Sequence, residues 1–405
     1  MATRLQQPRA VRAINTAGGL ASRLGLSPSL DEGGLVEAAR KRTGLEDLGD
    51  DGFRQGLRVL LRSLDGEAQL TPLGRIAART RIVGLLETRL RLVDRVHRDP
   101  SVGEEAIDRP VFVLGLPRTG TTVLYGMLAA DPAMRSPASW EVARPFPPPV
   151  ADDPARIAAM DKDFDRFRRI APTIDHIHPM GARLPQECLA LQAPEFASYE
   201  FVTAFPVPSY WDWLRAADLV PAYRFEKLFL QHLQRARRGS HWILKTPGHL
   251  MWLDALLEVF PDALLVQTHR NPTQVLASVS SLMSAMRSSV SDAVDPHAIG
   301  REQLDAWTWG MERTMAVRDR LPAGRVVDVR YEDTVADPVG TVRRVYEHFD
   351  LDFTPAVETG VQDYLAANPR DKHGSHRYTL EEFGLDRDEV DDAFAAYRAR
   401  FGVES

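Results

Sequence analysis

The sequence predicts an α/β fold in three layers around a central parallel sheet, with a helical segment before it and a long helical insertion within it. From Pro110 onward, short apolar runs alternate with helical segments, which is the pattern of consecutive β-α-β units. Before that point the apolar residues follow a helical period only. The chain of 405 residues is 44% hydrophobic and 26% charged, which is an ordinary globular composition.

Residues 1–104 are predicted to form a helical N-terminal segment that packs on the α/β domain of residues 105–405. Apolar residues recur at three- and four-residue steps in 35–42, 53–64 and 73–96. In the last of these stretches, Arg89 alone interrupts the apolar stripe. We expect the stripe to pack on the following domain, so that the segment supports the fold rather than carrying chemistry.

Four short apolar runs are predicted to be strands, and each is followed by a predicted helix. The strands are expected near 111–114, 242–245, 263–268 and 325–331, and the helices near 121–130, 250–259, 273–286 and 339–349. A short extra strand is expected near 134–136. This alternation is typical of a parallel sheet with helices on its faces.

A long insertion, about 145–240, separates the first two predicted strands. It begins with a stiff proline-rich bend at 145–149 and continues with helical segments rich in aromatic residues. Two interpretations of these aromatic side chains stay open: they wall an apolar ligand pocket, or they form the core of the insertion itself. The set comprises Tyr199, Phe201, Phe205, Tyr210, Trp211, Trp213, Tyr223, Phe225 and Phe229.

Charge and cysteine content exclude several classes of protein. With 50 Lys and Arg against 56 Asp and Glu, the net charge of −6 argues against a general nucleic-acid or membrane-surface binder. Cys188 is the only cysteine, which excludes an intramolecular disulfide and a multi-cysteine metal site. No run approaches the about 18 apolar residues of a membrane span, and no secretory leader is evident. We therefore expect a cytoplasmic protein.

The loop after the first predicted strand carries the strongest functional signal. Residues 115–122 read Gly-Leu-Pro-Arg-Thr-Gly-Thr-Thr and lead directly into a predicted helix. Glycine lets the backbone approach an anion, and the N–H groups and dipole of a helix N-terminus favour negative charge. Thr121 and Thr122 add hydroxyl donors. The sequence therefore predicts a P-loop-like, phosphate-cradling loop.

This loop departs from the complete loop of nucleoside-triphosphate-binding proteins. Gly115 and Gly120 have the expected spacing, but Thr121 stands where that motif has lysine, and the cation is Arg118. No apolar strand ends in an acid suited to hold magnesium, since Asp328 is followed by Arg330 on the same strand face. The sequence predicts no metal site.

Two motifs together resemble the sulfotransferase family, whose members use 3′-phosphoadenosine 5′-phosphosulfate (PAPS). Residues 116–122 resemble the family loop for the 5′-phosphosulfate, with Arg118 as its cation. Residues 263–272 resemble the strand that ends in the family's 3′-phosphate arginine, here Arg270, and Ser278 lies at the family spacing of eight residues. Arginine offers phosphate a bidentate fork, and serine adds a short donor.

Three further segments fit the same family over about 110–385. They are 242–247, which carries Lys245, the strand-to-helix step that begins at Tyr331, and the basic loop 370–376. The resemblance implies PAPS as co-substrate without a metal. The nucleotide-binding residues that it implies are Arg118, Thr119, Gly120, Thr121, Thr122, Arg270, Ser278, Tyr331, Lys372 and Gly374.

The implied reaction needs charge stabilisation and a general base. Arg118 and Lys245 are the candidates for stabilising charge on the departing oxygen. Glu141 is the first choice for the base, by resemblance to family members with a glutamate in that place, although it also suits a carboxylate at a helix start. The rivals are the pair His176 and His178, and Glu187. Glu187 also suits a structural pair with Arg183. A metal at His176 and His178 is disfavoured because no third histidine lies nearby.

Two other functions remain open from the sequence. One is an ATP-using P-loop kinase or hydrolase, and the other is a non-catalytic nucleotide-binding protein. The expected acceptor is a small molecule with a hydroxyl or amine, with a hydrophobic or aromatic alcohol as the working hypothesis. The sequence leaves the acceptor, the oligomeric state and the role of the N-terminal segment open.

Overall fold

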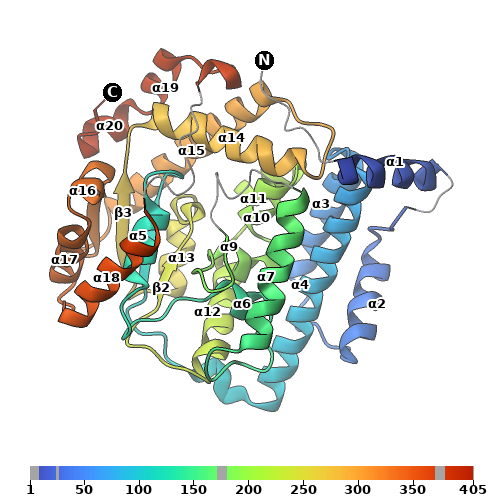
Figure 1. The fold of residues 1–405 in the computed structure, drawn as a ribbon, viewed down its shortest axis with the longest axis horizontal. Coiled ribbons are helices and arrows are strands. Elements are labelled where there is room, and N and C mark those ends of the chain that lie inside the picture. Colours follow the sequence, from blue (N-terminus) through green and yellow to red (C-terminus); the bar gives the residue numbers. More distant parts are fainter. Residues whose placement is uncertain (1–8, 24–26, 171–179, 370–378, 405) are drawn as a thin grey trace.

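The computed structural model describes residues 9–23, 27–170, 180–369 and 379–404 (Figure 1). A four-stranded parallel sheet lies at its centre, with the strand order β2-β1-β3-β4. The strands are β1 (Val111–Gly115), β2 (Ile243–Lys245), β3 (Leu264–His269) and β4 (Val326–Arg330). This confirms the predicted α/β fold and the four strand positions. The run at 134–136 contributes only an isolated bridge between Arg135 and Trp242.

Side chains of the central strands alternate between two hydrophobic layers. Val111 and Val113 point into one buried cluster, whereas Phe112 and Leu114 point into the other. This is the two-residue period of an extended strand. All five residues of β1 are buried, as expected for a parallel sheet that is covered on both faces.

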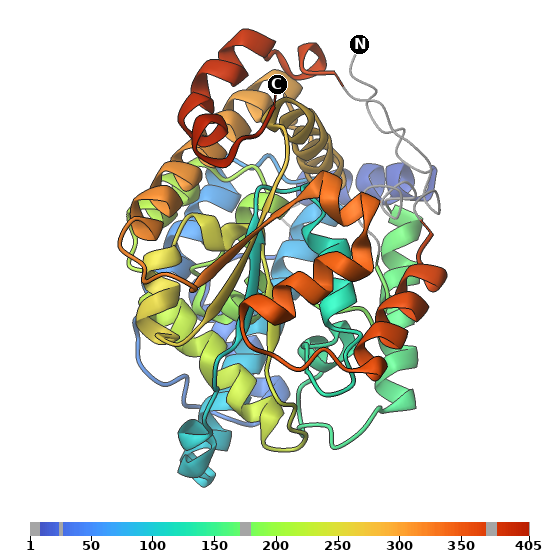
Figure 2. The ribbon, with the colours of Figure 1, turned by 90° about the vertical axis from the view of Figure 1, so that its left-hand side faces the viewer.

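Helices from the two ends of the α/β domain cover the first face. Figure 2 shows α17 and α18 in front of the strands, and α5 lies beneath them. The ring of Tyr364 lies directly over Gly126 of α5, where a Cβ atom would come within 2.2 Å of it. The helices on this side are α5 (Thr121–Leu128), α16 (Tyr331–Ala336), α17 (Pro338–His348) and α18 (Pro355–Ala367).

The second face is covered by helices that follow β2 and β3 and by the last helix of the insertion. These are η3 (Pro247–Leu250), α13 (Leu253–Val259), α14 (Pro272–Ser288), α15 (Pro296–Arg318) and α12 (Val220–Gln234). The C-terminal elements η4 (Glu381–Phe383), α19 (Arg387–Ala393) and α20 (Ala395–Phe401) pack on α14 and α15.

The insertion is helical, and its aromatic side chains form core. Its remaining elements are α7 (Pro154–Ile170), α9 (Leu189–Gln192), η2 (Ala193–Glu195), α10 (Tyr199–Ala204) and α11 (Pro208–Ala216), and the short helix α6 (Ser139–Ala143) precedes it. Of the nine aromatic residues singled out above, eight are buried in one hydrophobic cluster, and Trp213 packs against it. The interpretation as the core of the insertion therefore fits better than a pocket wall.

The N-terminal helices are α1 (Arg9–Arg23), α2 (Glu32–Thr43), α3 (Phe53–Gly66) and α4 (Pro72–Arg98), followed by η1 (Pro100–Glu104). Of these helices, α2, α3 and α4 contribute buried residues to that same cluster. α3 packs on α11, and α4 packs on η2. They lie on the side of the molecule away from α16–α18 (Figure 1). A domain boundary at residue 104 stays a prediction. Among the described residues, no helix combines the length and apolarity needed to cross a bilayer.

Arg89 joins the N-terminal segment to the insertion. Its side chain is 2% exposed, donates a 2.7 Å hydrogen bond to the carbonyl of Leu48, and pairs with Glu195 of η2. Its guanidinium also lies 4.2 Å from the ring centroid of Phe53. The charge that interrupts the apolar stripe of α4 is therefore a buried link between the two parts.

Replacing Arg89 should destabilise the protein. Arg89→Ala is expected to lower the free energy of unfolding by about 3–5 kcal/mol, because it leaves the Glu195 carboxylate buried without its partner. Arg91→Ala, on the exposed face of the same helix, should change it by no more than about 0.5 kcal/mol. Urea unfolding followed by circular dichroism measures both. Equal losses in the two variants would contradict a linking role for Arg89.

Candidate active site

The loop between β1 and α5 is bent by two glycines. Gly115 has φ 149°, and a Cβ atom there would lie 2.2 Å from Oγ1 of Thr268 on β3. Gly120 has φ 85° and directly precedes α5. Thr119 Oγ1 lies 2.6 Å from the carbonyl of Leu116 and 2.5 Å from Thr268 Oγ1. The buried Thr119 side chain thus holds the loop in shape, while its neighbours Arg118 and Thr122 are exposed.

The loop between β3 and α14 lies against the first loop. Asn271 caps α14 by accepting a 2.8 Å hydrogen bond from the backbone N–H of Thr273, and Pro272 occupies the first helical position. Arg270, just before this cap, donates a 2.8 Å hydrogen bond from Nη1 to the carbonyl of Arg118. Arg118 in turn donates from Nε to Oγ of Ser278 on α14 at 3.1 Å. The structure therefore brings Arg118, Arg270 and Ser278 together.

The register of the strands explains why these two loops lie against each other. Gly115 pairs with Thr268, and His269 pairs with Arg330, so β1, β3 and β4 end side by side. In parallel α/β sheets, ligands bind beyond these carboxyl ends. Tyr331 follows β4 directly, and its ring lies 4.0 Å from the Arg270 guanidinium. A Cβ atom on Gly120 would lie 3.1 Å from the same ring.

Lys245 reaches the same loop from the end of β2. Its side chain is 2% exposed, its Nζ lies 3.3 Å from Thr122 Oγ1, and it pairs with Glu187 of the insertion. Thr246 Oγ1 donates a 3.2 Å hydrogen bond to the other oxygen of Glu187. The expected partner of Glu187, Arg183, instead contacts Asp152. The structure therefore places Glu187, rather than Glu141, in contact with Lys245.

Glu141 lies in a buried ion pair. Its side chain is 1% exposed, and one oxygen accepts a 3.0 Å hydrogen bond from Nη2 of Arg135. The other oxygen accepts from the backbone N–H of Ala138 at 3.0 Å. Burial lowers the pKa of Arg135 to about 10, although Glu141 opposes that shift. Both carboxylate oxygens are thus engaged, as for a carboxylate at a helix start.

Asp328 is held by a structural cluster. It accepts hydrogen bonds from His269 Nε2 at 2.7 Å and from Nη1 and Nη2 of Arg318 at 2.6 and 2.8 Å. Burial favours the protonated acid, but hydrogen bonds from Arg318 and His269 outweigh it and hold the pKa of Asp328 below its usual range. This carboxylate therefore braces β4 against β3 and α15.

Several predicted residues lie outside the described part of the chain. They are His176, His178, Lys372 and Gly374. Their proposed roles stay predictions.

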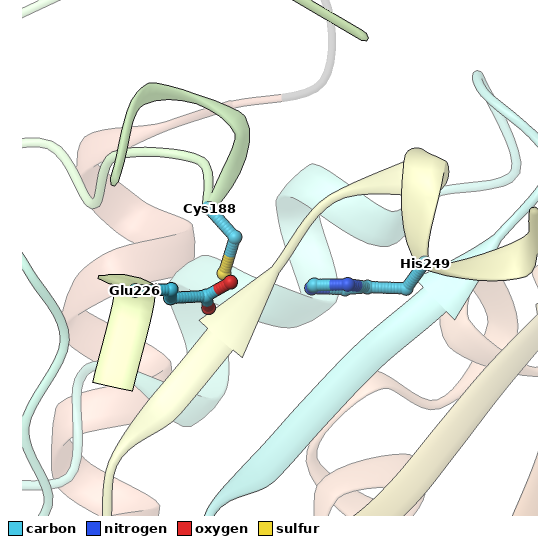
Figure 3. A group of neighbouring side chains, drawn as sticks. All are labelled: Cys188, Glu226 and His249. Carbon is cyan, nitrogen blue, oxygen red and sulfur yellow. The ribbon is translucent and has the colours of Figure 1, made fainter. Parts of the chain in front are cut away.

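A second group of polar side chains, buried in the interior, was not predicted from the sequence. Cys188, Glu226 and His249 are buried, and one potential ligand atom from each lies within 4.8 Å of the others (Figure 3). Burial raises the pKa of Glu226 to about 7 and lowers the pKa of His249 to about 3. The three come from different segments with no shared motif, so no local pattern could have revealed them.

Comparisons with known proteins agree on one family. The model of the sulfotransferase family matches residues 110–355. The crystal structure of sulfotransferase STF1 from Mycobacterium tuberculosis H37Rv is 34% identical with a TM-score of 0.81, and the match covers 90% of this chain and 98% of that one. Sulfotransferase STF9 from Mycobacterium avium is 30% identical with a TM-score of 0.86, covering 93% and 98%. Omega-hydroxy-beta-dihydromenaquinone-9 sulfotransferase Stf3 from Mycobacterium tuberculosis (strain CDC 1551 / Oshkosh) is 26% identical over 318 residues, which are 73% of this chain and 76% of that protein.

From the geometry of the loop we predict that it binds an anion, and the resemblance to the family implies that no metal is needed. Pyrophosphate in chelator-containing buffer should raise the melting temperature, because a ligand that binds only the folded state stabilises it. Arg118→Ala should weaken pyrophosphate binding about tenfold or more, since hydrogen bonds to charged groups contribute about 1.5–3 kcal/mol. Arg301→Ala, which removes an exposed arginine of α15, is the matched control. The same loss in both variants, or a shift that requires magnesium, would refute the site.

Proposed function

Because this chain belongs to the sulfotransferase family, we propose that it transfers a sulfuryl group from PAPS to a hydroxyl group of a small molecule. One observation supports this proposal most directly. The Arg270 guanidinium holds the Arg118 carbonyl, and the Arg118 guanidinium holds the Ser278 hydroxyl. The loop suited to a 5′-phosphosulfate and the residues suited to a 3′-phosphate are therefore in direct contact. We call this group, made of Arg118, Arg270 and Ser278, the anion corner.

The nucleotide would lie across this corner. Arg270 and Ser278 would hold the 3′-phosphate, with Arg270 oriented by the face of Tyr331. The backbone N–H groups that begin α5, together with Thr121 and Thr122, would hold the 5′-phosphate. The fit is favourable because the Arg270 and Arg118 guanidinium groups and the Lys245 ammonium group converge at the ends of adjacent strands.

Arg118 and Lys245 would supply the charge stabilisation. In the transfer, the bond from sulfur to the bridging phosphate oxygen breaks as a bond from sulfur to the acceptor oxygen forms. Negative charge grows on the bridging oxygen, and a positioned cation lowers the barrier by stabilising that charge. Lys245 is suited to this task because its ammonium group already touches the loop through Thr122.

Glu187 is the base that the geometry favours. The acceptor hydroxyl must lose its proton as it attacks sulfur, and a base must lie within hydrogen-bond reach. Glu187 contacts Lys245 and Thr246 beside the loop, and it is less buried than Glu141. When an anionic nucleotide draws Lys245 toward its bridging oxygen, the Glu187 carboxylate gains basicity and can accept the proton.

A hydroxylated small molecule is the proposed acceptor. The name of Stf3 describes an enzyme that acts on an omega-hydroxy menaquinone derivative. By that likeness we propose an alcohol as the acceptor class here. The buried aromatic residues of the insertion give no independent support for an aromatic acceptor, because they pack as core.

Nucleotide selectivity tests the proposal. Without magnesium, 3′-phosphoadenosine 5′-phosphate should raise the melting temperature well above the value with 5′-AMP or ATP. Arg270→Ala should cut the preference for the 3′-phosphorylated nucleotide over 5′-AMP about 10- to 100-fold, because it removes the charge-assisted bonds to one phosphate only. Isothermal titration calorimetry measures the ratio. Tighter binding of magnesium-ATP would favour a kinase or hydrolase instead.

A pair of matched variants tests the base. Glu187→Gln should lower kcat about 10²- to 10⁴-fold with little change in the nucleotide Kd, because the amide keeps a hydrogen-bond acceptor but takes up no proton. Glu141→Gln should instead lower the melting temperature, because it leaves Arg135 buried without a carboxylate. Its kcat per folded molecule should stay near the wild-type value. The reverse pattern in an assay with labelled PAPS would restore Glu141 as the base.

A further inference from the structure

Cys188, Glu226 and His249 meet in the interior, away from solvent. Cys188 begins the turn into α9, Glu226 lies in α12, and His249 lies in η3 just after β2. Figure 3 shows the thiol beside the carboxyl group, with the imidazole ring pointing toward both. All three side chains are buried, and their potential ligand atoms lie within 4.8 Å of one another.

Two polar atoms of this group have no hydrogen-bond partner among the described residues. They are Oε1 of Glu226 and Nε2 of His249. Buried polar atoms are paired in the great majority of proteins, because an unpaired one costs the full desolvation penalty. The Cys188 thiol hydrogen-bonds to the Glu226 carboxyl group, so the two unpaired atoms beside it indicate a partner that the described residues do not provide.

The second polar atom of the Glu226 and His249 side chains is hydrogen-bonded, and the backbone of Cys188 is held in place. Gln192 Nε2 donates to Oε2 of Glu226 at 2.8 Å. The Tyr223 hydroxyl and Nδ1 of His249 share a hydrogen bond of 2.9 Å. The backbone N–H of Cys188 donates to the carbonyl of Lys245 at 3.0 Å. Metal ligands are characteristically oriented by such outer hydrogen bonds, which leave one atom of each side chain directed at the ion.

We propose that Cys188, Glu226 and His249 bind a divalent transition-metal ion of zinc-like preference. Thiolate, carboxylate and imidazole are the ligands that Zn²⁺ takes in proteins, and three of them leave a fourth position for water. Ligand atoms around a tetrahedral zinc ion lie roughly 3.3–3.8 Å apart, so a small contraction of the group suffices. As the ion enters, the thiol and the carboxylic acid each release one proton to solvent, and the two negative ligands balance its charge.

The surroundings favour an ion over a bridging water molecule. A buried water needs two to four polar partners, and here only Glu226 Oε1 and His249 Nε2 are strong ones, whereas an ion would also engage the thiol, which is a weak hydrogen-bonding group. The cation that faces the group is Lys245, whose charge lowers the pKa of His249 after the larger effect of burial. Lys245 is itself paired with Glu187, which reduces its repulsion of a bound ion.

Cobalt binding to the full-length, tag-free chain tests this site. After treatment with a chelator, one equivalent of Co²⁺ should produce the near-ultraviolet charge-transfer band of a thiolate ligand and the intense visible bands of four-coordinate cobalt. Because Cys188 is the only cysteine of the chain, such a charge-transfer band identifies this site without ambiguity. Zn²⁺ should displace the cobalt and raise the melting temperature.

Three variants complete the test. Cys188→Ser should abolish the charge-transfer band, and Gln192→Ala should weaken cobalt binding about 10- to 100-fold while the band persists. His348→Asn, which replaces an exposed histidine of α17, should leave the charge-transfer band and the cobalt affinity unchanged. Circular dichroism checks that each variant is folded. If Cys188→Ser unfolds, Gln192→Ala still tests the site, because that variant keeps all three ligands.

Spectra without a thiolate band in the folded wild-type protein would overturn the proposal and favour a water-bridged group. Equal cobalt affinity in wild type and Gln192→Ala would also overturn it. These measurements need neither PAPS nor an acceptor, so they are independent of the proposed sulfuryl transfer.

Discussion

The close approach of Gly115 to Thr268 is the constraint on which the site depends. Any side chain at position 115 would collide with the Thr268 hydroxyl, and its φ of 149° is rare for residues other than glycine. This contact lets the first loop turn at the end of β1 and lie against the end of β3. Only then can Arg270 reach the Arg118 carbonyl, and Arg118 reach Ser278. The anion corner is therefore a consequence of strand packing.

The sequence predicted those parts that depend on neighbours along the chain. The buried strands and the two loops have local patterns, so their places were found, and Arg118, Arg270, Ser278 and Tyr331 meet in the structure. Parts that depend on tertiary pairing were not found. Arg89 interrupts an apolar stripe because its partner, Glu195, comes from the insertion. The run at 134–136 satisfies its backbone through one bridge and loop contacts instead of forming a strand.

The two glutamates show why a motif alone does not assign a base. Glu141 and Glu187 are both acids in the region of the first loop and the insertion, and nothing in their neighbours along the chain ranks them reliably. Their partners do. Glu141 neutralises a buried arginine with one oxygen and accepts the backbone N–H at a helix start with the other, so both of its oxygens are engaged in the interior. Glu187 pairs with Lys245, and in the proposed mechanism a bound anion attracts that lysine away, which couples the protonation of Glu187 to nucleotide binding.

Glu187 and Cys188 are consecutive residues with different surroundings, and this links the two polar groups of the molecule. Glu187 contacts the Lys245 side chain, while the Cys188 backbone N–H bonds to the Lys245 carbonyl and its thiol joins Glu226 and His249. His249 lies four residues after Lys245, within the tight turn η3. An ion bound by the buried group would therefore tie together both chain segments that carry Lys245 and Glu187. Fixing their separation would fix how strongly the lysine holds the carboxylate, and hence how readily that carboxylate takes a proton.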